Sequence, residues 1–393
     1  MAHHDNKPID IVVYGASGYT GRLVAEYLNK TYGNSGSLRW AMGGRNKEKL
    51  ESVRDEIGAS IETQIIVADS ADTDALNHMA EQSKVILTTA GPYQLYGSKL
   101  IEVCAHAGTD YVDLCGEPGW MRKMIDANSG AAKASGARIV FSCGFDSIPF
   151  DLGVFFLQQK AATEKNGPCT EVKTLVRSMK GTFSGGTAAS LKATMAAVFQ
   201  DASLMEILKS PYGLVPEFEG PRQPSGSKPR YDEELGLWLA PFIMAAINTK
   251  NVHRSNALMG HAYGKDFLYS EMLVTGKGDD GQKLAERVAG DNSLMGDDGP
   301  KPGEGPTKEE REAGNYDILF IGKCQDGSKL KASVQGDMDP GYGSTSKMIA
   351  EAALCLINEC PNVPGGILTP APAMGDALIK RLVANAGLSF QYE

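Results

Sequence analysis

Three regularly spaced glycines directly follow the first apolar run of the chain. Residues 9–14 have the composition of a buried strand, and the seven residues after them are Gly15, Ala16, Ser17, Gly18, Tyr19, Thr20 and Gly21. After a strand, the first such glycine bends the chain, the second lets backbone N–H groups approach a pyrophosphate, and the third lets the next helix pack closely. The phosphates would lie at the positive end of that helix. We predict that these residues bind a dinucleotide; a purely structural turn is the alternative.

The end of the second apolar run favours one dinucleotide over the other. An NAD site usually has Asp or Glu there, about 20 residues beyond the glycines, to hold the ribose hydroxyls. This chain has Gly43, Gly44, Arg45 and Asn46 instead. The guanidinium of Arg45 can pair with the 2′-phosphate of NADP(H), assisted by Asn46. We therefore predict NADP(H); the alternative is that Arg45 is an ordinary solvated side chain.

Two more strand ends should face the same edge of the sheet, where open α/β folds bind their ligands. Asp69 and Ser70 end the third apolar run and are expected to border the adenine. The residues after the fourth run are expected to border the nicotinamide ribose, and they are Ala90, Gly91, Pro92 and Tyr93. An ordinary turn is the alternative for Gly91 and Pro92.

Three hydroxyl groups are candidates for polarising a substrate, and they belong to Tyr93, Ser147 and Thr187. Ser147 lies in a run of small and polar residues where the chain leaves the predicted first domain, which suits the floor of a cleft. The alternative is that Ser147 or Asp146 caps the helix that begins near Pro149. The glycines and hydroxyls around Thr187 either hold a substrate oxygen at a helix N-terminus or form a plain cap.

The elements that would position these residues repeat regularly up to residue 150. Short apolar runs alternate with helical patterns, which indicates βαβ units and a doubly wound parallel sheet of the Rossmann type. Strands are predicted at 9–14, 38–42, 64–68, 85–89, 111–114 and 138–142. Helices are predicted at 20–30, 47–56, 72–81, 98–107 and 119–135.

Residues 151–393 have a different rhythm. Long β-type stretches are predicted at 171–183, 253–275, 316–324 and 329–337, with helices at 346–358 and 371–386. The fold class is therefore α/β, with a Rossmann domain over 1–150 followed by an α+β domain with a mainly antiparallel sheet over 151–393. Irregular surface insertions are predicted near 210–232 and 291–315, the second disordered. A last strand at 388–392 either closes the second sheet or rejoins the first domain.

Composition excludes several classes of protein. With 393 residues, a hydrophobic share of 42% and a formal charge of −9, the chain suits a soluble two-domain protein without affinity for nucleic acid. Its start lacks the apolar run of a signal peptide, and no long apolar segment predicts a membrane span. Seven cysteines without a CxxC pair indicate reduced thiols in the cytoplasm, and scattered histidines predict no metal site. The apolar stretch 235–247 could be core, a substrate channel, a homodimer contact or a membrane or lipid-droplet contact.

Taken together, the motifs resemble the saccharopine dehydrogenase-like oxidoreductases and, within them, the trans-acting enoyl reductase branch. The resemblance is carried by GASGYTG at 15–21, AMGGR at 41–45, AGPY at 90–93, DYVDLCGE at 110–117, GFDSIPFD at 144–151, SGGT at 184–187 and GGILTP at 365–370. It implies NADP(H) in a cleft between a Rossmann domain and a saccharopine-reductase-like domain. It also implies reduction of a carbon–carbon double bond in polyketide-derived lipids, as in glycolipid biosynthesis, with lipid-droplet association among animal relatives.

We therefore expect an NADPH-dependent oxidoreductase that reduces an activated C=C bond of a hydrophobic or acyl substrate in the inter-domain cleft. A donor would polarise the substrate carbonyl while the nicotinamide supplies hydride. One alternative is a saccharopine-type C–N oxidoreductase acting on an amino acid, which needs cations to hold several carboxylates; the candidates are Arg177, Arg222, Arg230 and Arg254. The other is a non-catalytic nucleotide-binding scaffold at a lipid surface.

Overall fold

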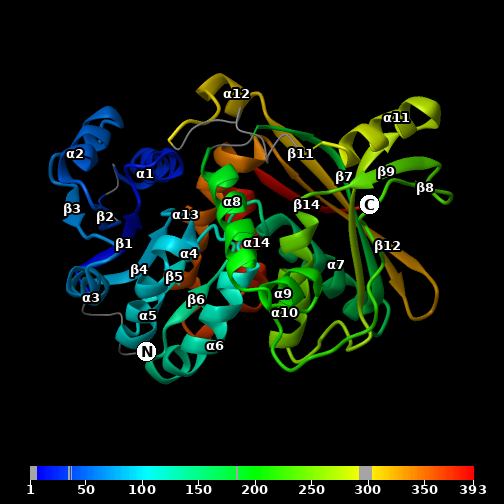
Figure 1. Cartoon of the computed structure of the whole chain (residues 1–393), viewed down its shortest axis with the longest axis horizontal. Coiled ribbons are helices and arrows are strands. Elements are labelled where there is room, and N and C mark those ends of the chain that lie inside the picture. The colour runs from blue at the N-terminus through cyan, green and yellow to red at the C-terminus, as the bar shows by residue number, and fades with distance from the viewer. Residues whose placement is uncertain (1–6, 34–35, 37, 183–184, 292–302) are drawn as a thin grey trace.

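The strands of the chain form two sheets of seven strands each (Figure 1). The computed structural model describes residues 7–33, 36, 38–182, 185–291 and 303–393, and the side chains of residues 185–188 lie outside that description. The first sheet has the order β13-β6-β5-β4-β1-β2-β3 and the second has the order β14-β12-β11-β7-β10-β9-β8.

The first sheet is parallel throughout, as in a Rossmann fold. Its strands are β1 (Ile9–Tyr14), β2 (Trp40–Gly44), β3 (Gln64–Val67), β4 (Ser83–Thr88), β5 (Asp110–Val112), β6 (Arg138–Val140) and β13 (Gly366–Leu368). All six residues of β1 are buried, which explains why the run is apolar on both faces. The predicted doubly wound parallel sheet is confirmed, and the strand ends differ from the predicted ones by a residue or two.

Five of the six helices that belong to the N-terminal part of this sheet are also close to their predicted bounds, and the short helix at 93–96 was not predicted. The six helices are α1 (Tyr19–Tyr32), α2 (Lys47–Glu56), α3 (Thr73–Gln82), α4 (Tyr93–Tyr96), α5 (Ser98–Ala107) and α6 (Pro118–Ser135). The bounds of α2 and α5 agree with the predicted ones. The side chains of Asn46 and Asp72 accept hydrogen bonds at the starts of α2 and α3, which is why these helices begin where they do.

The second sheet is mostly antiparallel, as expected. Its strands are β7 (Cys169–Lys180), β8 (Arg230–Asp232), β9 (Leu237–Pro241), β10 (Leu268–Gly276), β11 (Asn315–Cys324), β12 (Lys329–Gly336) and β14 (Leu388–Tyr392). Only the pair β7 and β10 is parallel among the strands described. Because β14 pairs with β12, the last strand closes the second sheet, which was one of the two alternatives open from the sequence.

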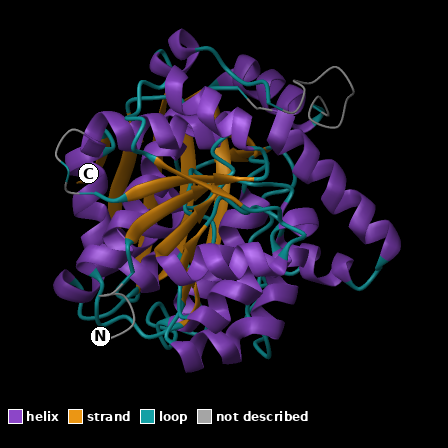
Figure 2. Ribbon diagram, turned by 90° about the vertical axis from the view of Figure 1, so that its left-hand side faces the viewer, coloured by secondary structure: helices purple, strands orange, loops and turns teal. Residues whose placement is uncertain are grey.

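The chain passes between the two sheets more than once. It leaves the first sheet after β6 through α7 (Ile148–Glu164), which packs on β11 and β12. It returns after β12 through the short helix η3 (Pro340–Ser344) to α13 (Thr345–Glu359), which packs on β1, β4 and β5, and then adds β13. It crosses back through α14 (Pro370–Asn385) to β14. Figure 2 shows the strands of both sheets surrounded by helices.

Three expectations for the second half were wrong. Residues 253–258 are not β-structure but the end of α10 (Ala245–Leu258), a helix whose buried side chains are mostly polar and therefore show no apolar helical stripe. The stretch 210–232 is not simply a surface insertion, because Tyr212, Leu214 and Val215 are buried. The described part of 291–315 contains α12 (Lys308–Glu312), which begins with a capping box; residues 292–302 lie outside the described residues.

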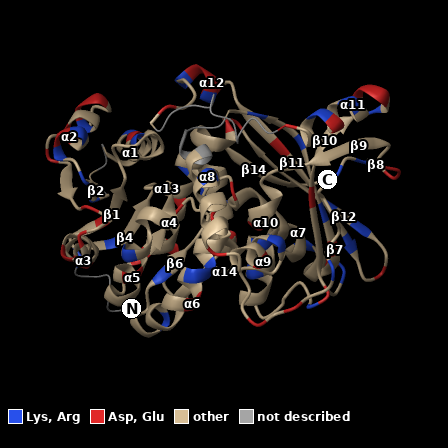
Figure 3. Ribbon diagram, viewed as in Figure 1, with Lys and Arg blue, Asp and Glu red and all other residues tan. Residues whose placement is uncertain are grey.

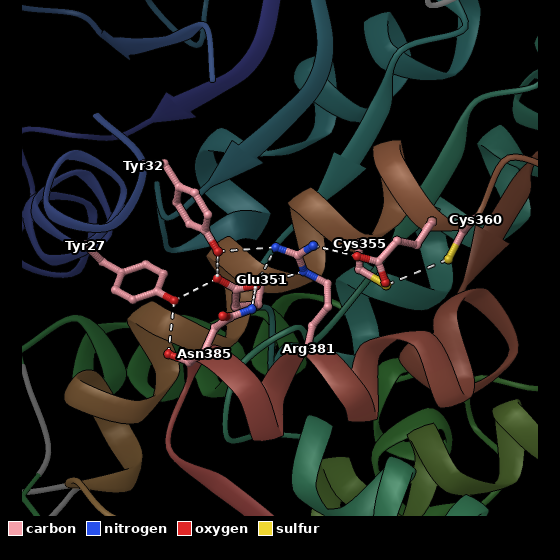
Figure 4. A network of polar contacts seen from close by, with 8 residues as sticks. Tyr27, Tyr32, Glu351, Cys355, Cys360, Arg381 and Asn385 are labelled. Carbon is pink, nitrogen blue, oxygen red and sulfur yellow. Dashed lines mark hydrogen bonds and ion pairs between the residues drawn. The ribbon is translucent and has the colours of Figure 1, made fainter. Parts of the chain in front are cut away.

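A buried ion pair holds α1 against the C-terminal helices (Figure 4). Glu351 of α13 is fully buried and pairs with Arg381 of α14 at 2.7 Å. The hydroxyls of Tyr27 and Tyr32, both on α1, donate to the same carboxylate. Asn385 donates to its second oxygen. With these donors the buried charge of Glu351 is satisfied, and the last turns of α1 are fixed relative to α13 and α14.

Charged side chains gather on outlying helices. Figure 3 shows acidic and basic residues mixed on α2, α12 and α11 (Gly278–Ala289). By contrast α8 (Gly185–Gln200), near the middle of the molecule, carries a single charged residue, Lys192. Among the helices that the structure describes, none is both long and apolar enough to cross a membrane.

Candidate functional site

The glycine turn leaves no room for a side chain at its last position. A Cβ atom on Gly21 would lie 2.1 Å from the carbonyl oxygen of Gly15, so α1 can begin this close to the turn only with glycine there. Gly15 has a φ of +90°, which side chains rarely adopt. Gly18 precedes α1 and supplies no side-chain cap, and the first turn contains no acidic residue. Because the first N–H groups of the helix lack a side-chain acceptor, the turn fits the pyrophosphate of a dinucleotide.

The residues predicted to contact the adenosine part of the dinucleotide lie at the ends of the neighbouring strands. Arg45 is exposed, and within the described residues it makes no hydrogen bond or ion pair. The side chain of Asn46 accepts from the Lys49 backbone N–H at 2.8 Å, and that of Asp69 accepts from the Ala71 N–H at 2.8 Å. Ser70 follows at the same edge and is half-buried.

The hydroxyl of Tyr14 shows that these strand ends are close together. It donates to the Ala68 carbonyl at 3.1 Å, at the end of β3. The pKa of Tyr14 is raised to about 12, mainly by burial and also by the charge of Asp69, while the charge of Arg45 opposes the change. The charges of Asp69 and Arg45 therefore both influence the Tyr14 hydroxyl, at the carboxyl edge of the sheet.

Hydrogen bonds of the Tyr93 side chain hold the segment that follows β4 in place. Ala90 and Gly91 follow the strand, the peptide bond between Gly91 and Pro92 is cis, and Tyr93 begins α4. The Tyr93 hydroxyl donates to the Thr88 carbonyl at 3.2 Å and accepts from the Leu114 N–H at 3.0 Å. Its proton would have to leave the Thr88 carbonyl before it could serve a substrate.

The side chain of Tyr19 faces the C-terminal half of the chain. Its hydroxyl donates to the Pro306 carbonyl and accepts from Arg311 at 2.9 Å. Its ring meets the ring of Tyr342 edge-on, with the centroids 5.3 Å apart. The segment that leads into α12 therefore packs against the start of α1.

A cavity of about 480 Å³ connects the dinucleotide edge to the second sheet. Thr20, Thr89, Gly91 and Tyr93 line it on the side of the first sheet. Apolar side chains line much of the rest, and they include Met179, Leu191, Met195, Leu208, Phe242, Ile243, Met244 and Ile247. The second half of the apolar stretch 235–247 thus faces this cavity. Its size and lining suit a nicotinamide and an apolar chain side by side.

Two of the residues lining this cavity carry an ionisable acid or base with a pKa shifted towards neutrality. Asp146, two residues before the start of α7, has a buried Oδ1 with no hydrogen-bond partner among the described residues, and burial raises its pKa to about 7. Lys250 on α10 is 3% exposed, and burial lowers its pKa to about 8. Perturbed groups in a cleft are frequent at functional sites. The sequence placed Asp146 in a run that suits a cleft floor, with a helix cap as the other interpretation, and it did not indicate Lys250.

The other two predicted donors are placed differently. Ser147 is fully buried; its hydroxyl donates to Asn248 Oδ1 at 2.6 Å and accepts from Asn251 at 2.8 Å. The expected cap is therefore wrong for Ser147, whose side chain bonds to α10 and does not cap α7. Ser147 does not line the cavity, although Asp146 beside it does. Thr187 falls in the first turn of α8, and its side chain is outside the described residues.

Comparison with known proteins places the chain in a family. A Mycobacterium tuberculosis protein named provisionally as a trans-acting enoyl reductase is 40% identical over 412 residues, which cover 98% of this chain and 97% of that protein. The chain belongs to the trans-acting enoyl reductase family. A trans-acting enoyl reductase of Mycobacterium ulcerans is 36% identical over 407 residues, covering 96% of each chain.

The same comparisons agree with the two-sheet architecture of this enoyl reductase family member. Residues 11–140 match the saccharopine dehydrogenase NADP binding domain. Together with the full-length relatives, this match makes the chain a member of an NAD(P)-binding oxidoreductase family. The apo saccharopine dehydrogenase (L-Glu forming) of Saccharomyces cerevisiae superposes with a TM-score of 0.56 over 98% of this chain and all of that one. At 10% identity this likeness shows a common fold.

The carboxyl of Asp146 gives a test of the cavity wall. Its pKa rises from about 3.9 in the unfolded chain to about 7 in the fold, so the wild type loses stability as pH increases through that interval. We expect Asp146→Asn to be more stable than the wild type at pH 8 by about 1–3 kcal/mol, and by much less at pH 4.5, in urea unfolding. Asp266→Asn, at an exposed carboxyl, is the control. An equal difference at both pH values would contradict the burial of this group.

Proposed function

We propose that this protein is an NADPH-dependent reductase of an activated C=C bond in a hydrophobic acyl substrate. The observation that supports this most is the cavity that runs from the glycine turn to the apolar wall formed by α8 and α10. Bound NADPH supplies hydride to the electrophilic carbon. The protein's own part is to hold the acyl chain against apolar side chains, to exclude water and to polarise the carbonyl. The relatives named trans-acting enoyl reductases support an acyl substrate.

The proposed cofactor form is NADP(H), bound through residues 15–21 and Arg45, with residues 69–70 at the adenine and 90–93 at the nicotinamide ribose. Arg45 is exposed at the end of β2, and the described residues offer it no acidic partner. A guanidinium in this state is available for a 2′-phosphate without first losing an ion pair. The match of residues 11–140 to an NADP-binding domain supports the same assignment.

Replacing Arg45 with Asp should weaken the binding of NADPH far more than the binding of NADH. We expect the Kd for NADPH to rise by about 10- to 150-fold, the equivalent of losing one charge-assisted hydrogen bond of about 1.5–3 kcal/mol, with NADH affinity nearly unchanged. Fluorescence titration of the purified protein measures both constants. Arg287→Asp, on α11 at the far side of the second sheet, is the matched control. Equal losses for the two nucleotides would contradict a 2′-phosphate contact.

The C–N oxidoreductase alternative has less support from the cavity. A substrate with several carboxylates needs several cations, and Lys250 is the one cation among the residues that line the described cavity. Arg177 instead pairs with Asp317 and Glu393, each at 2.7 Å. Arg254 donates to the carbonyls of Leu214 and Ile367. Neither of these guanidinium groups lines the cavity, and the same holds for Arg222 and Arg230.

We propose that the hydroxyl of Tyr93, Ser147 or Thr187 polarises the substrate carbonyl. The first lines the cavity, whereas the hydroxyl of the second is engaged by two asparagines of α10. We further propose a cytoplasmic protein that works without nucleic acid. We also propose that exposed apolar side chains such as Ile243, which is 51% exposed, contact a membrane or lipid-droplet surface or a second copy of the chain.

A substrate panel separates the proposed reaction from its alternatives. We expect NADPH absorbance to fall with the N-acetylcysteamine thioester of trans-2-dodecenoic acid and not with an amine plus an α-keto acid, because the cavity is apolar and holds one cation. The saturated dodecanoyl thioester is the matched control. Oxidation with the amine and keto acid alone would favour the C–N reaction. Tight NADPH binding without oxidation by either would favour the non-catalytic scaffold.

A further inference from the structure

Lys250 is a buried lysine that has no carboxylate partner among the described residues. It lies on α10, beside the cavity, and is 3% exposed. Its Nζ donates to the carbonyls of Leu208 and Ala246, each at 2.9 Å. An ammonium group has three N–H donors, so one remains for a further acceptor. Within the described chain no carboxylate lies within ion-pair distance of this Nζ.

This ammonium is the one cation among the residues that line the described cavity. Apolar residues flank it, since Ala246, Ile247 and Leu208 line the same wall. The neighbouring His253 on the same helix is neutral near pH 7, because burial and the charge of Lys250 lower its pKa to about 3. A methionine would fill the same space without the cost of burying a charge. A buried charge of this kind is worth most to a partner that develops negative charge.

We propose that Lys250 is a further catalytic residue, which binds the carbonyl oxygen of the acyl substrate beside the hydroxyl donor and stabilises the negative charge that gathers there. This inference rests on the proposed function. When hydride adds to the carbon β to the carbonyl, the π electrons of the C=C bond move towards the carbonyl oxygen. The remaining N–H of Lys250 donates to that oxygen, and no bond to the lysine forms or breaks. The resulting enolate is then protonated at the carbon α to the carbonyl by water, which completes the saturated acyl product. The two backbone carbonyls fix the ammonium in place beforehand, so little reorganisation is needed.

A structural alternative makes a different prediction. Leu208 lies near the end of α9 (Leu204–Lys209), so Lys250 could serve only to cap the carbonyl end of that short helix. In that case removal of the ammonium would loosen α9 and lower the affinity of the cavity for every ligand by the same factor. A contact to the substrate oxygen would instead change the preference for a negatively charged head group.

Ligand binding without turnover tests the proposal. Dodecanoate carries a charged oxygen that stands in for the developing enolate, and dodecanol carries none. At pH 6.5 we expect the wild type to bind dodecanoate about 10-fold or more tightly than dodecanol in calorimetric titrations. Lys250→Met should bring this ratio close to one while the affinity for dodecanol is kept. Lys209→Met, at an exposed lysine of α9, should leave the ratio unchanged.

Turnover and NADPH affinity of the Lys250 variant are two further measurements. Lys250→Met should lower kcat with the dodecenoyl thioester about 100- to 1000-fold and leave the Kd for NADPH as it was. An unchanged dodecanoate preference in Lys250→Met would overturn the proposal, and so would equal losses for both ligands. If the wild type shows the carboxylate preference but reduces no acyl thioester, the oxygen-binding role of Lys250 stands and the proposed reaction fails.

Discussion

The contact between Gly21 and the Gly15 carbonyl sets the geometry on which the rest of the site depends. A Cβ atom there would lie 2.1 Å from the oxygen, so only glycine lets α1 start against the turn. The free N–H groups of α1 consequently point to the carboxyl edge of the first sheet. At its other end α1 is held by Tyr27 and Tyr32 on the buried Glu351, which also binds Arg381. The C-terminal helices thus support the cofactor edge, although they follow it by more than three hundred residues.

The second sheet completes the site through a helix whose buried side chains are mostly polar. Asn248 and Asn251 of α10 hold the Ser147 hydroxyl where the chain leaves the first sheet, and Asn248 also donates to the buried Glu271 at 2.8 Å. Burial of these groups is costly unless each finds a partner. Lys250, on the same helix, has backbone partners and one donor left over. The cavity therefore combines an apolar wall with few polar groups, as small-molecule sites usually do.

The six strands of the first sheet that lie before residue 150 could be predicted to within two residues, and so could β11, β12, α13, α14 and β14 of the second half, whereas α10 and β13 could not. Strands buried on both faces and helices with side-chain caps leave local signals, as residues 9–14 and Asn46 illustrate. The helix α10 leaves none, because its buried face is polar, and β13 is three residues long and joins β6 from far along the chain. The glycine turn and Arg45 were recognisable by spacing. Asp146 and Lys250 were not, since their altered pKa values arise from burial that only the folded chain creates.

The central claim is that the cofactor and the acyl chain bind in one cavity. Transfer of an isotopic label from one to the other tests this claim most directly. NADPH deuterated at C4 of the nicotinamide, in each of its two configurations, would be incubated with the protein and the trans-2-dodecenoyl thioester. The saturated product would then be analysed by mass spectrometry and NMR. Our account predicts that one of the two labelled cofactors places a single deuterium on the carbon β to the carbonyl. A reduced product without deuterium from either cofactor, or NADPH oxidation without a reduced product, would contradict it.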